Sequence, residues 1–225
     1  MSRYERVYLI LCAFFIASLL TGNMLVFKAF DVPLPFVGSA TLICGIIPYP
    51  ITFLCTDLIS ELYGKRRADA VVIAGFLVSI YMLLVIQTGR AVPLSHFQDP
   101  IVQEQYDAVF GQSVRAIFAS MVAYLVAQLL DVRIYHFWKR WTNGKHLWLR
   151  NNGSTLISQL VDTILVITIL FSGVWTTKQI ISVIIASYVF KALVALADTP
   201  LMYLGAYLFR DIEQETERRL NRGVL

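Results

Sequence analysis

Six stretches of the chain are apolar over the length of a membrane-crossing helix, and more polar segments separate them. They occupy residues 7–30, 39–63, 68–87, 116–137, 155–175 and 180–209. A helix needs about 20 residues to cross the hydrocarbon core of a bilayer. The pattern therefore predicts an all-α membrane protein: one integral membrane domain over 1–225, built as a six-transmembrane-helix bundle with a short helical tail at 210–225.

The basic residues predict how this bundle lies in the membrane. Of the nineteen Lys and Arg residues, thirteen precede the first stretch or follow the second, fourth and sixth, whereas four lie in the alternate segments. Cytoplasmic loops carry the excess of positive charge in membrane proteins. We therefore expect both termini in the cytoplasm. Residues 88–113 would then form an external loop, either a lid or an ordinary solvated connection.

The composition agrees with a membrane protein and excludes some other classes. The chain is 57% hydrophobic and only 15% charged, whereas soluble domains carry about 25% charged residues. Its net charge of +4 comes from loop residues, where membrane topology and anionic lipid explain it, so we expect no nucleic-acid partner. Cys12, Cys44 and Cys55 lie in apolar stretches without a CxxC pair, which indicates buried thiols rather than a metal site or a disulfide.

Polar side chains inside the predicted spans are the main functional candidates. A charge at the centre of a span costs at least ~2.5–3.5 kcal/mol, so such residues need a reason to be there. Counting a rise of ~1.5 Å per residue from the cytoplasmic loops places polar groups of four spans near the membrane midplane. The candidates for this midplane site are Asp57, Gln128, Asp131, Gln159, Asp162, Lys191 and Asp198. Glu61 is shallower, and a solvated helix end explains it equally well.

Two of these polar groups repeat along the chain. Gln128–Asp131 and Gln159–Asp162 share a Q-L-x-D pattern in consecutive spans. Residues three apart lie on one helix face, and consecutive spans run in opposite directions. The two pairs would therefore face one another head to tail, offering amide and carboxylate groups to a flat polar ligand.

Two features of the spans leave alternatives open. Pro48 and Pro50 break the second stretch, so 39–47 is either irregular backbone near a substrate site or the approach to a simple kink or helix start. Lys191 either contacts a ligand or neutralises a nearby acid. That acid is Asp198, seven residues on, or Asp162 across the bundle.

The sequence favours a protein that is not an enzyme. His96, His136 and His146 lie in loops or at the end of a span and form no HExxH motif, and GxSxG and GxGD motifs are absent from the sequence. We expect no catalytic residue, no cofactor and no metal.

Four groups of residues resemble a known family. They comprise 56–58 with 61–64; Arg115 with 119–120, Gln128 and Asp131; 147–152 running on through 154–155 to Gln159 and 162–163; and 188–191 with 198–200. Together they resemble the queuosine precursor transporter family, part of the wider vitamin uptake transporter group. The run LWLRNN-x-ST-x3-Q-x2-DT is the most specific part of this resemblance.

The resemblance implies a multi-pass protein of the bacterial inner membrane that imports 7-deazaguanines such as preQ0, preQ1 or queuine. Its partners would be this small-molecule base and membrane lipid, and a homo-oligomer stays open. A carboxylate accepts hydrogen bonds from the adjacent N–H donors of a guanine edge, and Gln, Lys or Arg115 donates to the acceptor of that edge. Phe53, Phe118 and Phe190 are aromatic candidates for stacking on the base.

Three mechanisms remain compatible with these residues. The first is secondary uptake, with a buried Asp carrying a proton. The second is the substrate-binding subunit of an energy-coupling-factor vitamin importer, which would co-purify with an ATPase module. The third is a membrane-embedded enzyme acting on a lipid or isoprenoid, which would turn over in detergent without a gradient.

Overall fold

The computed structural model describes residues 1–25, 28–34, 38–111, 114–173 and 175–221 of the chain. These residues form eight α-helices, a short 3-10 helix and a two-stranded hairpin. In chain order the elements are α1 (Arg3–Leu25), β1 (Ala29–Leu34), β2 (Gly38–Ile43), η1 (Cys44–Ile46), α2 (Tyr49–Tyr63), α3 (Lys65–Ala91), α4 (Ile101–Phe110), α5 (Val114–Trp141), α6 (Leu147–Phe171), α7 (Thr177–Leu208) and α8 (Arg210–Asn221).

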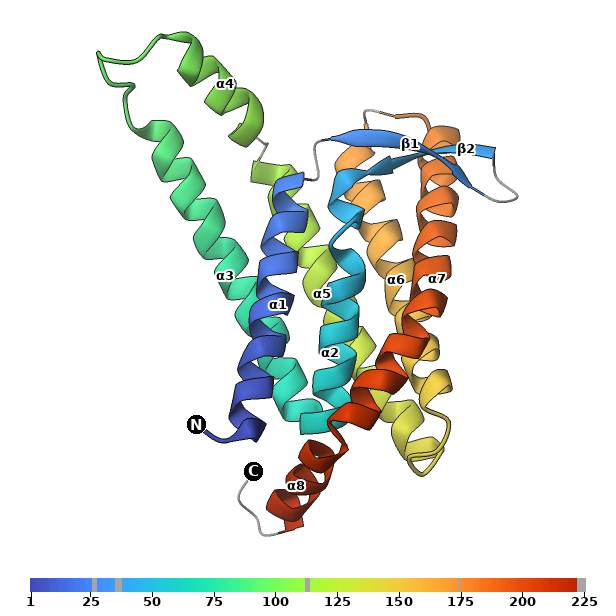
Figure 1. Cartoon of the computed structure of the whole chain (residues 1–225). Helices are drawn as coiled ribbons and strands as arrows, with labels where there is room; N and C mark the ends of the chain where they lie inside the picture. The colour runs from blue at the N-terminus through green and yellow to red at the C-terminus, as the bar shows by residue number, and fades with distance from the viewer. Residues whose placement is uncertain (26–27, 35–37, 112–113, 174, 222–225) are drawn as a thin grey trace.

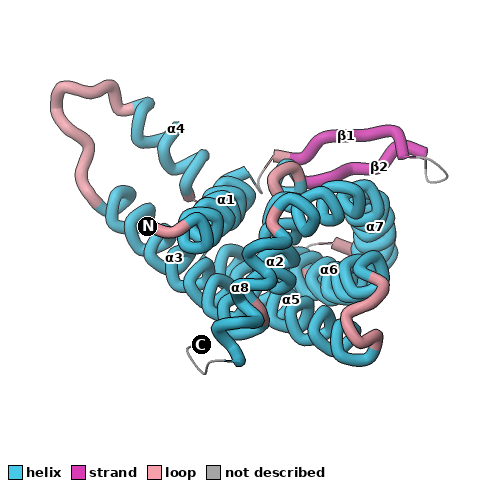
Figure 2. Tube along the Cα trace, turned by 60° about the horizontal axis from the view of Figure 1, so that its bottom comes forward, coloured by secondary structure: helices cyan, strands magenta, loops and turns pink. Residues whose placement is uncertain are grey.

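The helices α1, α2, α3, α5, α6 and α7 lie side by side along one direction (Figure 1). The two ends of this bundle differ. The N-terminus, α8, the α2–α3 connection and the α5–α6 connection lie together at one end, which we call the termini end. The β1–β2 hairpin and α4 lie at the other, which we call the hairpin end, and Figure 2 shows α4 and the hairpin on opposite sides of the bundle.

The distribution of side chains differs from that in a soluble protein. Large apolar residues such as Phe14, Leu77 and Leu204 are exposed on the helices, whereas acids and amides are buried between them. Within the described residues, α1, α3, α7 and residues Leu147–Ile169 of α6 are long and apolar enough to cross a membrane. Apolar side chains on the outside are stable only against lipid or another apolar surface. The predicted class, an all-α membrane protein, is confirmed by this arrangement.

The prediction of one helical span over 39–63 is wrong in its first part. Residues of β1 and β2 form an antiparallel hairpin in which Ala29 pairs with Ile43 and Leu34 with Gly38. The same hairpin takes up the end of the first predicted span, 7–30, because β1 begins at Ala29. Apolar runs are compatible with either a strand or a helix, and Pro33 and Gly38 oppose helix here.

Helix α2 is therefore short, and proline and glycine set its limits. Pro48 precedes it and Pro50 lies in its first turn, where a proline costs no hydrogen bond. The helix ends at Gly64, whose positive φ of 81° lets α3 begin at once. At Gly205 of α7, a Cβ would lie 2.6 Å from a methyl carbon of Leu58. The missing side chain thus lets α7 approach α2 closely.

The other predicted spans correspond to α3, α5, α6 and α7, and the predicted tail helix to α8. Helix α6 begins at Leu147, eight residues before the predicted start at 155. The loop predicted at 88–113 contains α4, which Arg90 joins to α3 through a 2.8 Å bond to Asp107. A hydrogen bond from Gln103 and this contact with Arg90 lower the pKa of Asp107, whose side chain is partly exposed.

Candidate functional site

Helices α1, α2, α5, α6 and α7, together with the end of β2 and η1, line a cavity of about 110 Å³, which we call the main cavity. Its polar lining includes Ser18 and Asn23 of α1, Tyr49 of α2, Asp162 of α6 and Lys191 of α7. Apolar side chains complete the walls. A cavity with apolar walls and a few convergent polar groups is the usual form of a small-molecule site.

The ion pair between Lys191 and Asp162 dominates the main cavity. Lys191 Nζ lies 2.7 Å from Asp162 Oδ2 and 4.1 Å from the centroid of the Tyr49 ring. The Tyr49 side chain lines the same cavity and lies close enough to Asp162 to interact with its charge. The structure therefore selects one of the two acids expected for Lys191, namely Asp162. The lysine is held by a charge and by an aromatic face at once.

A smaller cavity of about 20 Å³, which we call the side cavity, adjoins the first, because Tyr49 and Lys191 line both. Phe53, Phe190, Gln159, Asp198 and Thr155 also line it. The buried Oε1 atom of Gln159 has no hydrogen-bond partner in the described part of the chain. An unpaired buried amide oxygen costs free energy unless a ligand or a water molecule donates a hydrogen bond to it.

Neither cavity is lined by three of the predicted site residues, namely Asp57, Gln128 and Asp131. Ser158 Oγ donates to Asp131 Oδ1 at 2.8 Å, and Thr155 Oγ1 donates to Asp57 Oδ2 at 3.3 Å. The two carboxyl groups lie close enough to interact electrostatically, although no hydrogen bond joins them in the described part of the chain. We call Asp57 and Asp131 the carboxyl pair. The two Q-L-x-D groups thus belong to two different clusters.

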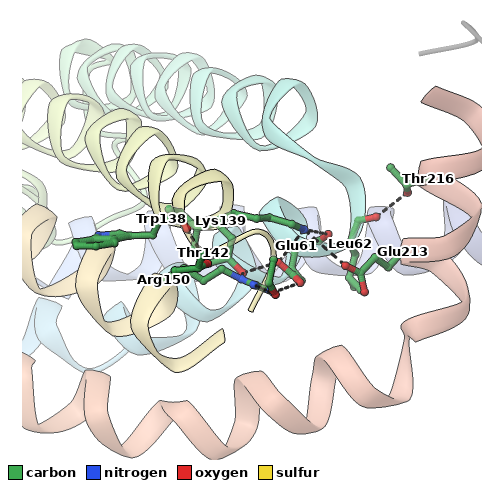
Figure 3. Close-up of polar contacts among 10 residues, drawn as sticks. Glu61, Leu62, Trp138, Lys139, Thr142, Arg150, Glu213 and Thr216 are labelled. Carbon is green, nitrogen blue, oxygen red and sulfur yellow. Dashed lines mark hydrogen bonds and ion pairs between the residues drawn. The ribbon is translucent and has the colours of Figure 1, made fainter. Parts of the chain in front are cut away.

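Glu61 is not solvated. It is buried in a cluster of charges that joins α2, α5 and α6 near the termini end (Figure 3). Arg150 donates to Glu61 Oε1, Lys139 Nζ lies 3.0 Å from Glu61 Oε2, and the Tyr135 hydroxyl donates to the same oxygen at 2.9 Å. We call these four residues the charge cluster.

Helix α8 is attached to the edge of this cluster. Lys139 Nζ lies 3.6 Å from Glu213 Oε1, and Thr216 Oγ1 donates to the Leu62 carbonyl at 2.6 Å (Figure 3). Burial raises the pKa of Glu213, and so does the nearby charge of Glu61. The attachment explains why a helix of mostly charged residues is ordered against the bundle.

Sequence reasoning missed several of these residues. Arg150 was counted only as a loop cation, although its place in the LWLRNN run marks it as unusual. Tyr49 lies between two prolines at the start of a helix, which is the one local signal for it. The side chains of Arg115 and Phe118 lie outside the part of the chain that the structure describes. Among the described residues, His, Cys, Asp and Glu side chains form no group of three suited to a metal.

A bundle of lipid-facing helices around a polar, ion-paired cavity defines a multi-pass membrane protein with the architecture of a small-molecule transporter. The chain belongs to the family described as "Putative vitamin uptake transporter", whose sequence model matches residues 43–205. That range covers both cavities' lining residues except those of α1.

Two similar proteins carry more specific names. The chain is 29% identical to the "Probable queuosine precursor transporter" of Bacillus subtilis (strain 168) over 196 residues, 87% of this chain and 82% of that protein. It is 26% identical to the "Queuosine precursor transporter" of Escherichia coli (strain K12) over 204 residues, 86% of this chain and 83% of that protein. No solved structure matches the chain. The family resemblance predicted from the sequence is confirmed.

Proposed function

We propose that this protein imports queuosine precursors, 7-deazaguanine bases such as preQ0, preQ1 or queuine, across the bacterial inner membrane by secondary transport. The observation that carries the proposal is the Lys191–Asp162 pair, which lines a cavity in a chain related to proteins named for these substrates. The site requires no catalytic residue or cofactor for this role.

The polar groups of the cavity match a guanine edge. Such an edge presents two adjacent N–H donors followed by a carbonyl acceptor. A carboxylate accepts both donors, and an ammonium group beside it donates to the carbonyl. Asp162 and Lys191 are adjacent in this way, 2.7 Å apart. We assign Asp162 to the donor edge and Lys191 to the carbonyl.

The side cavity suits the rest of the ligand. Phe53 and Phe190 both line it, beside Gln159 and Asp198. Aromatic rings stack on the face of a base, while an amide and a carboxylate bind polar substituents or a charged amine. The two cavities share a wall at Lys191, so a base held by Asp162 reaches both.

The proposal includes six membrane crossings with both termini in the cytoplasm. Reporter fusions at Gly64, Asn143 and the C-terminus should all give cytoplasmic signals, and a fusion at Asp99 an external signal. The expectation rests on the excess of Lys and Arg in the segments at the termini end. An external C-terminus would contradict both the orientation and the number of crossings.

A binding panel tests the substrate class. The purified protein should gain thermal stability with preQ0, preQ1 or queuine at concentrations well above Kd, because a ligand that binds only the folded state stabilises it. Riboflavin and biotin serve as controls. Stabilisation by these vitamins but by no 7-deazaguanine would replace the proposal with a general vitamin carrier.

Three other experiments separate the two other mechanisms from secondary transport. An ATPase module that co-purifies with the chain would favour the binding subunit of an energy-coupling-factor importer. Turnover of a lipid or isoprenoid in detergent, without any gradient, would favour a membrane enzyme. Secondary transport requires instead that reconstituted protein moves substrate with no nucleotide present.

A further inference from the structure

The carboxyl pair is buried without a countercharge. Asp57 is 2% exposed and Asp131 is 0% exposed. Within the described residues, no Lys or Arg side chain forms an ion pair with either of them, whereas Asp162 is paired with Lys191 and Glu61 with Arg150 and Lys139. Their hydrogen-bond donors are the hydroxyl groups of α6 described above. Neutral donors do not offset two buried negative charges.

The polar atoms around the pair point to a missing cationic ligand. Asp57 Oδ1 and Asp131 Oδ2 have no partner in the described part of the chain. One further buried oxygen, Ser60 Oγ, lies one turn from Asp57 along α2 and is also unpaired. Two neighbouring carboxylates cannot both be charged at low dielectric, whereas one proton on the pair provides a donor and removes one charge.

We propose that the carboxyl pair of Asp57 and Asp131 is the site that binds and releases the proton driving substrate uptake, with Thr155 connecting it to the side cavity. The inference rests on the proposed function. It separates two roles that the sequence assigns to one midplane site: Asp162 and Lys191 recognise the substrate, and Asp57 and Asp131 carry the proton.

Thr155 gives the two sites a physical connection. It lines the side cavity, and its hydroxyl donates to Asp57. Helix α6 also carries Ser158, the donor to Asp131, one turn before Asp162 of the substrate site. A substrate that shifts α6 by binding Asp162, or that displaces Thr155, therefore changes the hydrogen bonds of the carboxyl pair. The change in turn alters how strongly the pair holds its proton.

The groups facing the pair set its titration. On α2 these are Glu61, four residues from Asp57, and Tyr49; on α5 the group is Tyr135. Helix α6 supplies the hydroxyls of Ser154, Thr155 and Ser158, and the ion pair of Asp162 with Lys191 of α7 follows one turn further along. Glu61 is itself offset by Arg150 and Lys139. A shared proton is therefore the main positive charge that offsets the two carboxylates of the pair.

The transport step balances with one proton for each molecule of base, whatever the charge of the base itself, when the membrane potential is held at zero. A proton from the external side occupies the pair together with bound substrate, and both leave toward the cytoplasm. One pH unit corresponds to about 1.4 kcal/mol. A gradient of one unit should therefore support about a tenfold accumulation of substrate in vesicles.

The test uses the whole protein in proteoliposomes with labelled preQ1 as the probe. We expect the wild type to accumulate preQ1 about tenfold at a one-unit pH gradient. Asp57→Asn and Asp131→Asn should each reduce the accumulation ratio to about one. Both variants should still be stabilised against heat by preQ1 and should still exchange internal for external preQ1. Asp107→Asn, a partly exposed carboxyl group on α4, is the matched control and should accumulate like the wild type.

A second measurement needs no substrate and so separates this inference from the proposed function. Infrared spectra of the wild type at pH 7 should contain a C=O band of a protonated carboxyl group. Asp57→Asn and Asp131→Asn should each remove it, and Asp107→Asn should not. Absence of the band in the wild type would overturn the inference whatever the substrate is.

Three transport outcomes would also overturn it. Asn variants that still concentrate preQ1 would show that the pair carries no coupling proton. Loss of exchange together with loss of thermal stabilisation would place the pair in the substrate site instead. Wild-type accumulation that disappears when choline replaces Na⁺, and that ignores the pH gradient, would assign sodium to this role.

Discussion

Replacing Glu61 with Leu should lower the free energy of unfolding by about 3–5 kcal/mol, because it leaves a buried cation without its acid. Arg150 is 3% exposed and its guanidinium group bonds to the Glu61 carboxylate. The neighbouring Lys139 is also offset by Glu61, at 3.0 Å. Without that acid, two positive charges face one another in the charge cluster. Thermal or denaturant unfolding in detergent measures the loss.

Two further variants identify the cause of this loss. Glu213→Gln removes an acid at the partly exposed edge of the same cluster, 3.6 Å from Lys139, and should cost no more than about 1 kcal/mol. The double variant Glu61→Leu with Arg150→Met removes both buried charges and should recover much of the stability, since paired removal is often neutral. A double variant as unstable as Glu61→Leu alone would show that shape, not charge, matters here.

The helices are the part of the fold that the sequence predicts well. An apolar run of sufficient length has few alternatives to a helix in lipid, since only helices and closed barrels satisfy the backbone there. The hairpin is the exception, because residues 29–34 and 38–43 are apolar and lie at an end of the bundle. Hydropathy identifies their surroundings but not their conformation.

The sequence predicts one depth for the candidate site residues, but it does not predict the directions in which their side chains point. Counting residues from a loop gives the height of a side chain along a helix, whereas its direction depends on how the helices are rotated against one another. Asp131 faces Asp57 and Ser158, and Asp162 faces Lys191 and Tyr49. One expected site is therefore two clusters.

The charge cluster could not be inferred from one sequence for a related reason. Arg150 and Lys139 read as loop cations, because they flank the connection between α5 and α6. Their countercharge is Glu61, far away in the chain. The pairing arises only when α2 packs against α5 and α6, and no local pattern encodes it.

A ligand with a guanine edge should bind at least ~10³-fold more tightly than its adenine-like isomer. The matched probes are 7-deazaguanine and 7-deazaadenine, which differ in their pairing edges. The guanine edge offers two donors to Asp162, and Lys191 meets its carbonyl. The adenine edge turns an acceptor toward the carboxylate and an amino group toward the ammonium, so both polar groups of the protein lose their partners. Competition against labelled preQ1 measures the ratio.

Asp162→Asn shows whether this carboxylate is the group that recognises the edge. An amide offers one acceptor and one donor, which fits the acceptor and amino group of adenine better than the two donors of guanine. We expect the variant to lose about 10–100-fold in affinity for 7-deazaguanine, and to lose much of its rejection of 7-deazaadenine. Asp107→Asn should leave both affinities unchanged. Equal competition by the two isomers in the wild type would remove the base-edge model. Undiminished discrimination in Asp162→Asn would assign the base edge to a different acid. Asp198, which lines the side cavity, would then be the next residue to replace.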